Sequence, residues 1–225
     1  MCKLRWIAGA FSIAVLPGLA AAEEAVKIGN AYALLNKPAS PQAVVILIPG
    51  GHGQMNIRPD GSFGDLRGNQ LVRTRQAYMG HGIATLTIDL GVNVASAVEY
   101  SRKIAPNVVV AGTSRGSLRV HKALPARPNG IVVTAAFLPN VRSNIGSAAA
   151  APPILVVQHR KDGCHHTLPQ NVEPFQAWGG SKVKVVWMDG GVNTGNPCHA
   201  RAYHGFNGLD GQVVSAVASF AKSLK

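Results

Sequence analysis

The sequence predicts an α/β protein with a mostly parallel central sheet and helices on both faces. Short apolar runs rich in β-branched residues recur along the chain, and segments suited to helices separate them. The runs are continuous rather than alternating, which is typical of strands buried on both faces of a parallel sheet. Ligands of such sheets bind beyond the carboxyl ends of the strands, so we expect the functional residues in the loops at that edge.

The expected strands are apolar segments that end near glycine, proline or polar residues. In chain order they are an edge strand at 26–35 and buried strands at 43–48, 82–90, 108–111, 131–138, 154–157 and 183–188. The expected helices are 70–80, 94–104, 115–123, 172–178 and 212–224. The last of these has Val213, Val217, Phe220 and Leu224 at helical spacing. A proline-rich turn at 36–41, a glycine-rich loop at 54–69 and a small-residue linker at 146–153 connect them.

Residues 1–22 have the pattern of a secretory signal peptide. Lys3 and Arg5 form a short positive region, 6–19 is apolar, and three alanines precede Glu23. The apolar stretch is shorter than the roughly 20 residues that a membrane span needs. We therefore expect cleavage near Ala22, a periplasmic or secreted protein with no transmembrane segment, and a single domain at 23–225.

The chain is basic, with a formal net charge of +12. Removal of Lys3 and Arg5 would leave 20 basic residues against 10 acidic ones. The basic residues are scattered, without a dense run or interleaved aromatic residues, so we do not expect nucleic-acid binding. A basic surface on a secreted protein fits solubility or attraction to anionic surfaces or substrates.

Cys164 and Cys198 are the cysteines that remain once Cys2 leaves with the signal peptide. A single pair in an oxidising compartment predicts a disulfide, closing a loop of about 34 residues. The alternative is a zinc site that adds His159, His165, His166 or His199, but the spacing fits no compact ligand motif. We expect the disulfide, no metal and no cofactor.

Residues 107–117 hold the strongest functional signal in the chain. An apolar run leads into Gly112-Thr-Ser-Arg-Gly116, a G-x-S-x-G pattern, and a helix-compatible segment follows. A strand that turns sharply into a helix exposes the serine at a strained turn, and flanking glycines avoid steric collisions there. The helix N-terminus favours developing negative charge. We therefore interpret Ser114 as a nucleophile rather than an incidental loop serine.

A serine nucleophile needs a base, and the base needs an orienting carboxylate. In α/β-hydrolases the chain order is serine, acid, histidine. Asp162 follows the strand at 154–157, and His204 lies in the loop after 183–188, so both fit that order. A Cys164–Cys198 bond would tie the acid loop to the histidine loop and hold both in register.

These features together resemble the α/β-hydrolase superfamily, in particular small lid-poor hydrolases similar to dienelactone hydrolase. The resemblance rests on Gly50-Gly51-His52-Gly53, the Ser114 motif, Asp162 and His204, and it extends over nearly all of 23–225. It implies a minimal or absent cap domain. Dienelactone hydrolases have a cysteine nucleophile, and this chain departs from them in having Ser114.

The resemblance also implies an oxyanion hole of two backbone N–H groups. One would come from Arg115, the residue after the nucleophile, and the other from Gly51 or His52. The glycines around them would let the backbone approach a substrate closely, although the same run also fits a tight turn.

Other residues compete for the same roles. Asp89 and Asp189 also follow expected strands, but Asp89 follows the wrong strand for the chain order and Asp189 precedes two glycines typical of a turn. His199 is the alternative to His204, and His165 or His166 is expected to line the substrate cleft.

The sequence thus predicts a secreted serine hydrolase that cleaves small or extended carboxylic esters through Ser114, His204 and Asp162. The same machinery could cleave amides or thioesters. A different class of function is also open: a non-catalytic envelope-binding or interaction protein on the same scaffold. The oligomeric state is not indicated.

Overall fold

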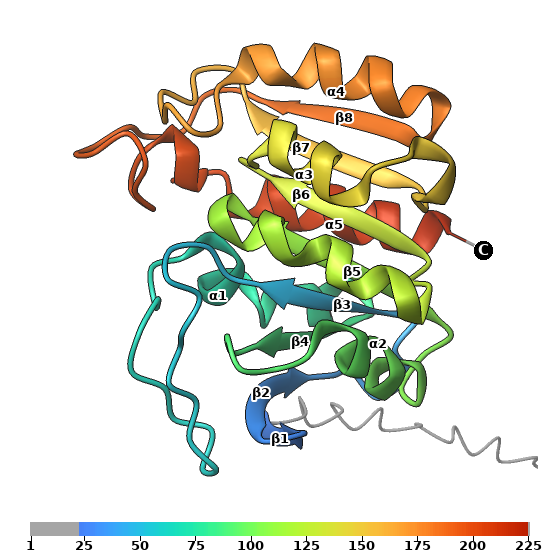
Figure 1. The fold of residues 1–225 in the computed structure, drawn as a ribbon. Helices are drawn as coiled ribbons and strands as arrows, with labels where there is room; N and C mark the ends of the chain where they lie inside the picture. Colours follow the sequence, from blue (N-terminus) through green and yellow to red (C-terminus); the bar gives the residue numbers. More distant parts are fainter. Residues whose placement is uncertain (1–22, 225) are drawn as a thin grey trace, which may run out of the picture.

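The computed structural model describes residues 23–224, and their strands form one sheet (Figure 1). The strands are β1 (Glu24–Ile28), β2 (Ala31–Asn36), β3 (Ala43–Ile48), β4 (Ile83–Ile88), β5 (Asn107–Thr113), β6 (Gly130–Thr134), β7 (Ile154–His159) and β8 (Val183–Met188). Their order is β1-β2-β4-β3-β5-β6-β7-β8. The pairs β1–β2 and β2–β4 are antiparallel and the others parallel, as the sequence predicted for most of the sheet. The predicted signal peptide lies outside the described residues.

Helices cover both faces of the sheet (Figure 1). The α-helices are α1 (Gln70–Thr74), α2 (Val94–Arg102), α3 (Leu138–Ile145), α4 (Val172–Gly179) and α5 (Asp210–Ser223). The 3₁₀ segments are η1 (Ala77–His81), η2 (Ser114–Ala126), η3 (Ala148–Ala150), η4 (Pro169–Asn171), η5 (Gly180–Lys182) and η6 (Tyr203–Gly205). Among residues 23–224, no helix combines the length and the apolar character that a membrane span requires.

The central strands divide the core into two layers. Every residue of β3 is fully buried, and its side chains alternate between the two faces. Val44, Ile46 and Ile48 pack in the layer covered by α2, η2, α3 and α4, whereas Val45 and Leu47 pack in the layer covered by α1, η1 and α5. This two-sided burial explains why β3 reads as a continuous apolar run.

The expected edge strand at 26–35 is instead a hairpin of two strands. Ile28 pairs with Ala31, so the chain reverses through Gly29 and Asn30. Gly29 has φ of 62°, a conformation that glycine adopts without a steric penalty. A Gly-Asn pair between two apolar segments is itself a hairpin signal, and the interpretation of 26–35 as one strand overlooked it.

The expected strand at 131–138 ends earlier, at Thr134. Ala135 has φ of 42°, and its N–H donates to the carbonyl of Val157, which turns the chain out of the sheet. Pro139 lies in the first turn of α3, where its fixed φ and missing N–H are tolerated. The apolar residues up to Leu138 therefore belong partly to a helix.

The helix expected at 70–80 breaks after Thr74 into α1 and η1. The Thr74 hydroxyl donates to the Gln70 carbonyl at 2.7 Å, and the Thr85 hydroxyl donates to the Arg75 carbonyl at 2.8 Å. Carbonyls engaged by side chains in this way compete with the continuing helix. The expected small-residue linker at 146–153 contains the short 3₁₀ segment η3.

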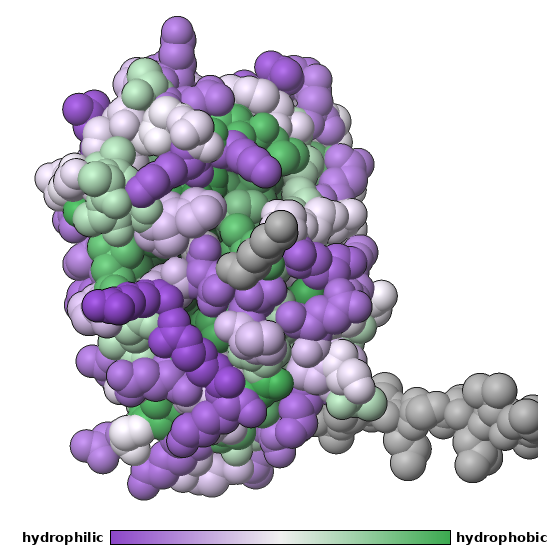
Figure 2. Space-filling view, turned by 90° about the vertical axis from the view of Figure 1, so that its right-hand side faces the viewer, coloured by the Kyte–Doolittle hydropathy of each residue, from purple (hydrophilic) through white to green (hydrophobic). Residues whose placement is uncertain are grey.

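The parallel strands end at one edge of the molecule, at the left in Figure 1. The long irregular segments 49–69 and 189–202 extend from this edge, and no connection within 23–224 forms a cap domain. Figure 2 shows another side, where hydrophilic residues predominate with apolar ones between them. The loops that carry the candidate site lie at the carboxyl edge instead, and many of their residues are exposed.

Candidate active site

Ser114 lies at the sharp turn between β5 and η2. Its φ of 50° is in the left-handed region, which costs a non-glycine residue about 1–2 kcal/mol. η2 begins at Ser114 and continues to Ala126, so the helix expected at 115–123 is present with 3₁₀ rather than α-helical hydrogen bonding. The side chain is partly exposed, as a group that must meet a ligand requires.

Three glycines make room for this turn. A Cβ at Gly112 would lie 2.8 Å from the carbonyl oxygen of Gly116, and a Cβ at Gly116 would lie 2.5 Å from that of Pro49. At Gly50 a Cβ would lie 2.9 Å from Cβ of Ser114. Real Cβ atoms do not approach so closely, so the glycines let β3, β5 and η2 meet around Ser114.

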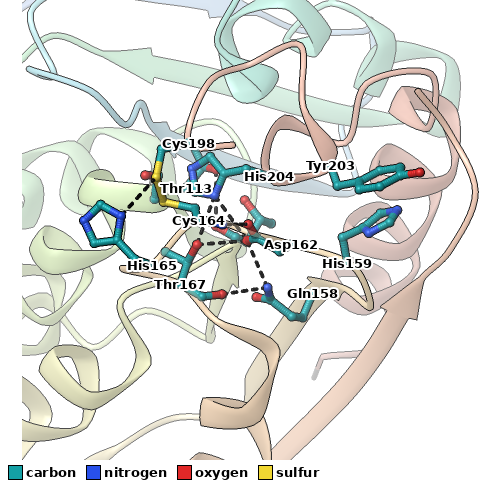
Figure 3. A network of polar contacts seen from close by, with 12 residues as sticks. Thr113, Gln158, His159, Asp162, Cys164, His165, Thr167, Cys198, Tyr203 and His204 are labelled. Atoms are coloured by element: carbon teal, nitrogen blue, oxygen red, sulfur yellow. Dashed lines mark hydrogen bonds and ion pairs between the residues drawn. A yellow bond between two sulfur atoms is a disulfide. The ribbon is translucent and has the colours of Figure 1, made fainter. Parts of the chain in front are cut away.

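Asp162 lies just beyond β7 and is almost completely buried (3% exposed). Its Oδ1 accepts a hydrogen bond from the backbone N–H of Cys164 at 2.9 Å. Its Oδ2 accepts from Gln158 Nε2 at 3.0 Å and from the Thr167 hydroxyl at 2.8 Å, and lies 3.2 Å from His204 Nδ1 (Figure 3). These donors occupy both oxygens of the buried carboxylate and fix its orientation.

His204 lies in η6 and is also buried (5% exposed). Its Nδ1 is 3.2 Å from Asp162 Oδ2 and 3.0 Å from the Thr167 hydroxyl oxygen. Since the Thr167 hydrogen is directed to Asp162, its oxygen is left to accept from His204. The Asp162 carboxylate and the Thr167 oxygen are both acceptors, so Nδ1 of His204 carries the hydrogen. In the neutral ring, Nε2 therefore has a free lone pair.

A small cavity of about 50 Å³ is lined by both Ser114 and His204. Gly51, Asn69 and Thr113 also line it. No hydrogen bond joins Ser114 to His204 within residues 23–224, but the shared cavity places both side chains on one small space. Catalytic hydrogen bonds are often long in the absence of substrate and shorten when it binds.

A larger cleft of about 390 Å³ opens beside this cavity. It is lined by Ser114, Arg115, Gly51 and His52, which brings the expected oxyanion residues beside the serine. Gly51 has φ of 64°. Among residues 23–224, the N–H groups of Gly51 and His52 donate no hydrogen bond, so they are available to an acceptor in the cleft.

Cys164 and Cys198 form a disulfide that joins the loop after β7 to the loop after β8. Cys164 lies two residues after Asp162, and the second loop leads to His204. Figure 3 shows the bridge near Asp162 and His204, and both cysteines line the cleft beside Ser114. Potential ligand atoms of Cys164, His165 and Cys198 lie within 4.8 Å of one another, but disulfide sulfurs are not the thiolates that bind zinc.

The rival acids have other surroundings. Asp89 is buried, and its carboxylate accepts the backbone N–H groups of Met55, Ile57 and Leu90 at 2.7–3.0 Å. It therefore anchors the loop at 54–69. Asp189 accepts the N–H of Gly190 at 2.8 Å, as expected of a turn residue.

Most other histidines near the site do not contact Asp162. His159 stacks on Tyr203, with 4.3 Å between ring centroids, and its Nε2 contacts the Gly190 carbonyl at 3.0 Å (Figure 3). His165, His166 and His199 line the cleft, as the sequence suggested for the first two.

Three residues of the site escaped the sequence analysis: Thr167, Gln158 and Asn69. Thr167 bridges Asp162 and His204, and Gln158 fixes Asp162. Asn69 caps α1 by accepting the N–H of Leu71 at 3.2 Å and lines the Ser114 cavity. None of them ionises, so a search for acids, bases and nucleophiles does not detect them. Thr167 lies in the same loop as Asp162, which is the available signal.

The strand order, the Ser114 turn and the placement of these loops define the α/β-hydrolase fold. The chain matches no model of a known protein family and no curated protein. Solved structures with the same fold include an α/β serine hydrolase without a lid from Xanthomonas campestris. That protein is 15% identical, with a TM-score of 0.60 over 90% of this chain and 97% of the other.

Two further structures have similar folds. A dienelactone hydrolase from Anabaena variabilis is 15% identical, with a TM-score of 0.62 over 90% of this chain and 96% of the other. The esterase domain of a Rhodothermus marinus protein is 12% identical, with a TM-score of 0.61 over 90% and 98%. At such identities the likeness establishes the fold, and the predicted resemblance is confirmed at that level.

Proposed function

We propose that this protein is a secreted serine hydrolase that cleaves carboxylic esters through an acyl-enzyme. Ser114 is the nucleophile, His204 the general base and acid, and Asp162 the orienting carboxylate. The observation that carries the proposal is the strained, partly exposed Ser114 sharing a cavity with His204, whose Nδ1 is engaged by Asp162 and Thr167.

The mechanism follows from the tautomer of His204. With hydrogen on Nδ1, the Nε2 lone pair takes the proton of Ser114 as Oγ attacks the ester carbonyl. The imidazolium then protonates the leaving alcohol, and an acyl-serine remains. Water repeats the sequence: Nε2 takes its proton, the hydroxide attacks the acyl carbonyl, and Ser114 leaves with the proton restored. Asp162 stabilises the imidazolium in both halves.

The backbone N–H groups of Arg115 and of Gly51 or His52 would bind the oxyanion. Gly51 lines both the small Ser114–His204 cavity and the larger cleft, whereas His52 lines the cleft alone, and this favours Gly51 as the second donor. A donor of this kind is worth about 3 kcal/mol of barrier. No step of this mechanism calls for a metal or cofactor.

Esters are favoured over amides and thioesters on two grounds. Several proteins of the same fold are described as esterases, including the Rhodothermus marinus domain. The cleft is also open and without a cap in 23–224, which suits small or extended substrates rather than long acyl chains that need an enclosed pocket. The amide and thioester alternatives use the same residues.

A periplasmic or secreted location belongs to the proposal. It rests on the signal-peptide pattern of residues 1–22 and on the disulfide, which persists in oxidising compartments. N-terminal sequencing of protein exported by a Gram-negative host would test it, with cleavage near Ala22 as the expected result.

A fluorophosphonate probe tests the nucleophile. The folded wild-type protein should be labelled at one site, and Ser114→Ala should not be labelled. Ser117→Ala is a matched control, because Ser117 lies in the same segment but is buried, with its hydroxyl bonded to the Ser114 carbonyl. A panel of p-nitrophenyl esters of graded acyl length, with Ser114→Ala as the blank, then defines the substrate range.

The competing proposal is a non-catalytic binding protein on this scaffold. A binding role gives no reason for the strained φ at Ser114 or for its cavity shared with His204. Absence of labelling in folded wild-type protein, together with no turnover in the ester panel, would favour this alternative.

A further inference from the structure

Among residues 23–224, the cleft beside Ser114 is lined by an arginine and several hydrogen-bond-donating side chains, and no carboxylate lines it. Arg115 and four histidines contribute to it: His52, His165, His166 and His199. The carboxylate closest to it in sequence, Asp162, is buried and its oxygens are already occupied by donors.

Arg115 is a free cation at this cleft. Its side chain is exposed, and within residues 23–224 its guanidinium forms no ion pair or hydrogen bond. Two arginines elsewhere in the fold are engaged by contrast: Arg73 pairs with Asp210, and Arg119 donates to backbone carbonyls. A guanidinium without a protein partner beside a reactive serine is available to bind a carboxylate through two parallel hydrogen bonds.

The histidines add donors to the same space. His52 Nδ1 accepts the N–H of Gln54 at 3.2 Å, which leaves Nε2–H as the free donor of the neutral ring. His166 stacks on Phe137 with 5.0 Å between ring centroids, and His165 packs against His166 at 3.8 Å. His165 and His166 thus pack side by side, and both line the cleft.

A second cavity of about 560 Å³ extends this surface. It shares Asn196 and His199 with the cleft and is lined by Arg201 and by Arg73, which pairs with Asp210. No carboxylate of the described residues 23–224 lines it. The excess of basic residues over the whole chain attracts anions to such a groove and raises their rate of encounter.

We propose that the preferred substrates are esters that carry a carboxylate, bound by Arg115 and the histidine-lined cleft. This inference rests on the proposed hydrolase function and names its substrate class. Because Arg115 directly follows Ser114, its side chain starts beside the reacting carbonyl. The carboxylate therefore lies in the cleft while the ester lies at Ser114. The acyl and alcohol sides of the ester are both eligible to carry it.

Two matched substrate pairs test this proposal and distinguish the sides. On the acyl side, p-nitrophenyl hemiadipate is compared with p-nitrophenyl hexanoate, since an adipate chain is too long for efficient attack by its own carboxylate. On the alcohol side, 4-acetoxybenzoate is compared with its methyl ester. The anionic member of at least one pair should have a kcat/KM higher by about tenfold at low salt, and added salt should lower this preference.

Matched variants locate the effect. Arg115→Gln keeps the backbone N–H and should reduce the anionic-to-neutral ratio of kcat/KM by about tenfold, with Arg115→Lys intermediate. Lys122→Gln removes the same charge from an exposed position of η2 outside the cleft and should leave the ratio unchanged. Equal effects of the two glutamine variants would attribute the preference to general surface charge and overturn the site.

Failure of this proposal can be separated from failure of the hydrolase proposal. Turnover of neutral esters with a ratio within about twofold for both pairs would leave the hydrolase intact and overturn the anionic preference. If no ester is cleaved, calorimetric titration of Ser114→Ala with monoethyl adipate still decides the question. Binding that diethyl adipate does not reproduce would support the cleft, and no binding of either would overturn it.

Discussion

The hydroxyl oxygen of Thr167 lies 3.0 Å from Nδ1 of His204. The same hydroxyl donates to Asp162 Oδ2 at 2.8 Å, so Thr167 joins the base and the acid of the proposed mechanism (Figure 3). The arrangement fixes the His204 tautomer and limits the rotation of its ring. We therefore expect Thr167 to act as a positioning residue rather than one that touches substrate.

Thr167→Val tests this role, because valine keeps the shape and removes the hydroxyl. Loss of this buried hydroxyl should lower the free energy of unfolding by about 1–3 kcal/mol. Because His204 is then less well oriented, kcat should fall about tenfold or more. Thr167→Ser restores the hydroxyl and should recover most of the activity. Steady-state kinetics on one p-nitrophenyl ester checks both variants, and a valine variant as active as wild type would contradict the role.

Asp162 and Asp89 should respond differently to replacement by asparagine. Asp162→Asn should lower kcat by about 10⁴-fold while the fold is retained, because the amide no longer orients and stabilises the protonated His204. Asp89→Asn removes an anionic acceptor from the N–H groups of Met55 and Ile57. It should lower the free energy of unfolding by about 1–3 kcal/mol and leave kcat of the folded protein nearly unchanged. Urea denaturation and kinetics on the same preparations separate the two effects.

Removal of the disulfide should affect both stability and catalysis. The bridge closes a loop with a sequence separation of 34 residues, for which the chain-entropy model gives about 3–4 kcal/mol. The double variant Cys164→Ser, Cys198→Ser should lose about that much in urea denaturation. It should also have a lower kcat, because the loops that carry Asp162 and His204 lose their common anchor. Unchanged kcat with reduced stability would restrict the bridge to a structural role.

Gly116→Ala tests the close packing at the Ser114 turn. The new Cβ would meet the carbonyl oxygens of Ile48 and Pro49, which are backbone atoms with little room to move. We expect a loss of about 3 kcal/mol in the free energy of unfolding, with weaker fluorophosphonate labelling. Gly211→Ala is the control, since a Cβ there meets nothing within 4 Å and lies in α5. It should stabilise the protein by about 0.5–1 kcal/mol.

We expect the protein to lose stability at alkaline pH because of Tyr78. Its side chain is fully buried, and burial, with a smaller contribution from the charge of Asp210, raises the pKa of its phenol far above the ordinary value of 10. Above about pH 10 the unfolded chain releases this proton while the folded protein keeps it. Stability should therefore be complete below pH 10 and fall by up to about 1.4 kcal/mol per pH unit above it.

Tyr78→Phe provides the comparison. The Tyr78 hydroxyl has no hydrogen-bond partner among the described residues, so its removal should be neutral or stabilising near pH 7. Urea denaturation from pH 7 to pH 11 should show a shallower decline in the variant. Equal slopes for the two proteins would mean that Tyr78 does not contribute to the pH dependence.

The sequence alone determined the class of fold and the chain order of the candidate residues. Continuous apolar runs such as 43–48 are readable because burial on both faces of a sheet removes any alternation. The turn at Ser114 can be predicted from sequence because it tolerates only glycine at positions 112 and 116, and this requirement produces a local sequence motif.

Only the tertiary structure decided how the loops meet. Thr167 and His204 are 37 residues apart in sequence, and nothing local indicates that their side chains share a hydrogen bond. Asp89 and Asp162 both follow strands, yet one receives the N–H groups of a neighbouring loop and the other a histidine. The reason is physical: local sequence fixes strands and turns through steric limits and burial, whereas the partner of a polar side chain depends on which distant loops the packed sheet brings to the same edge.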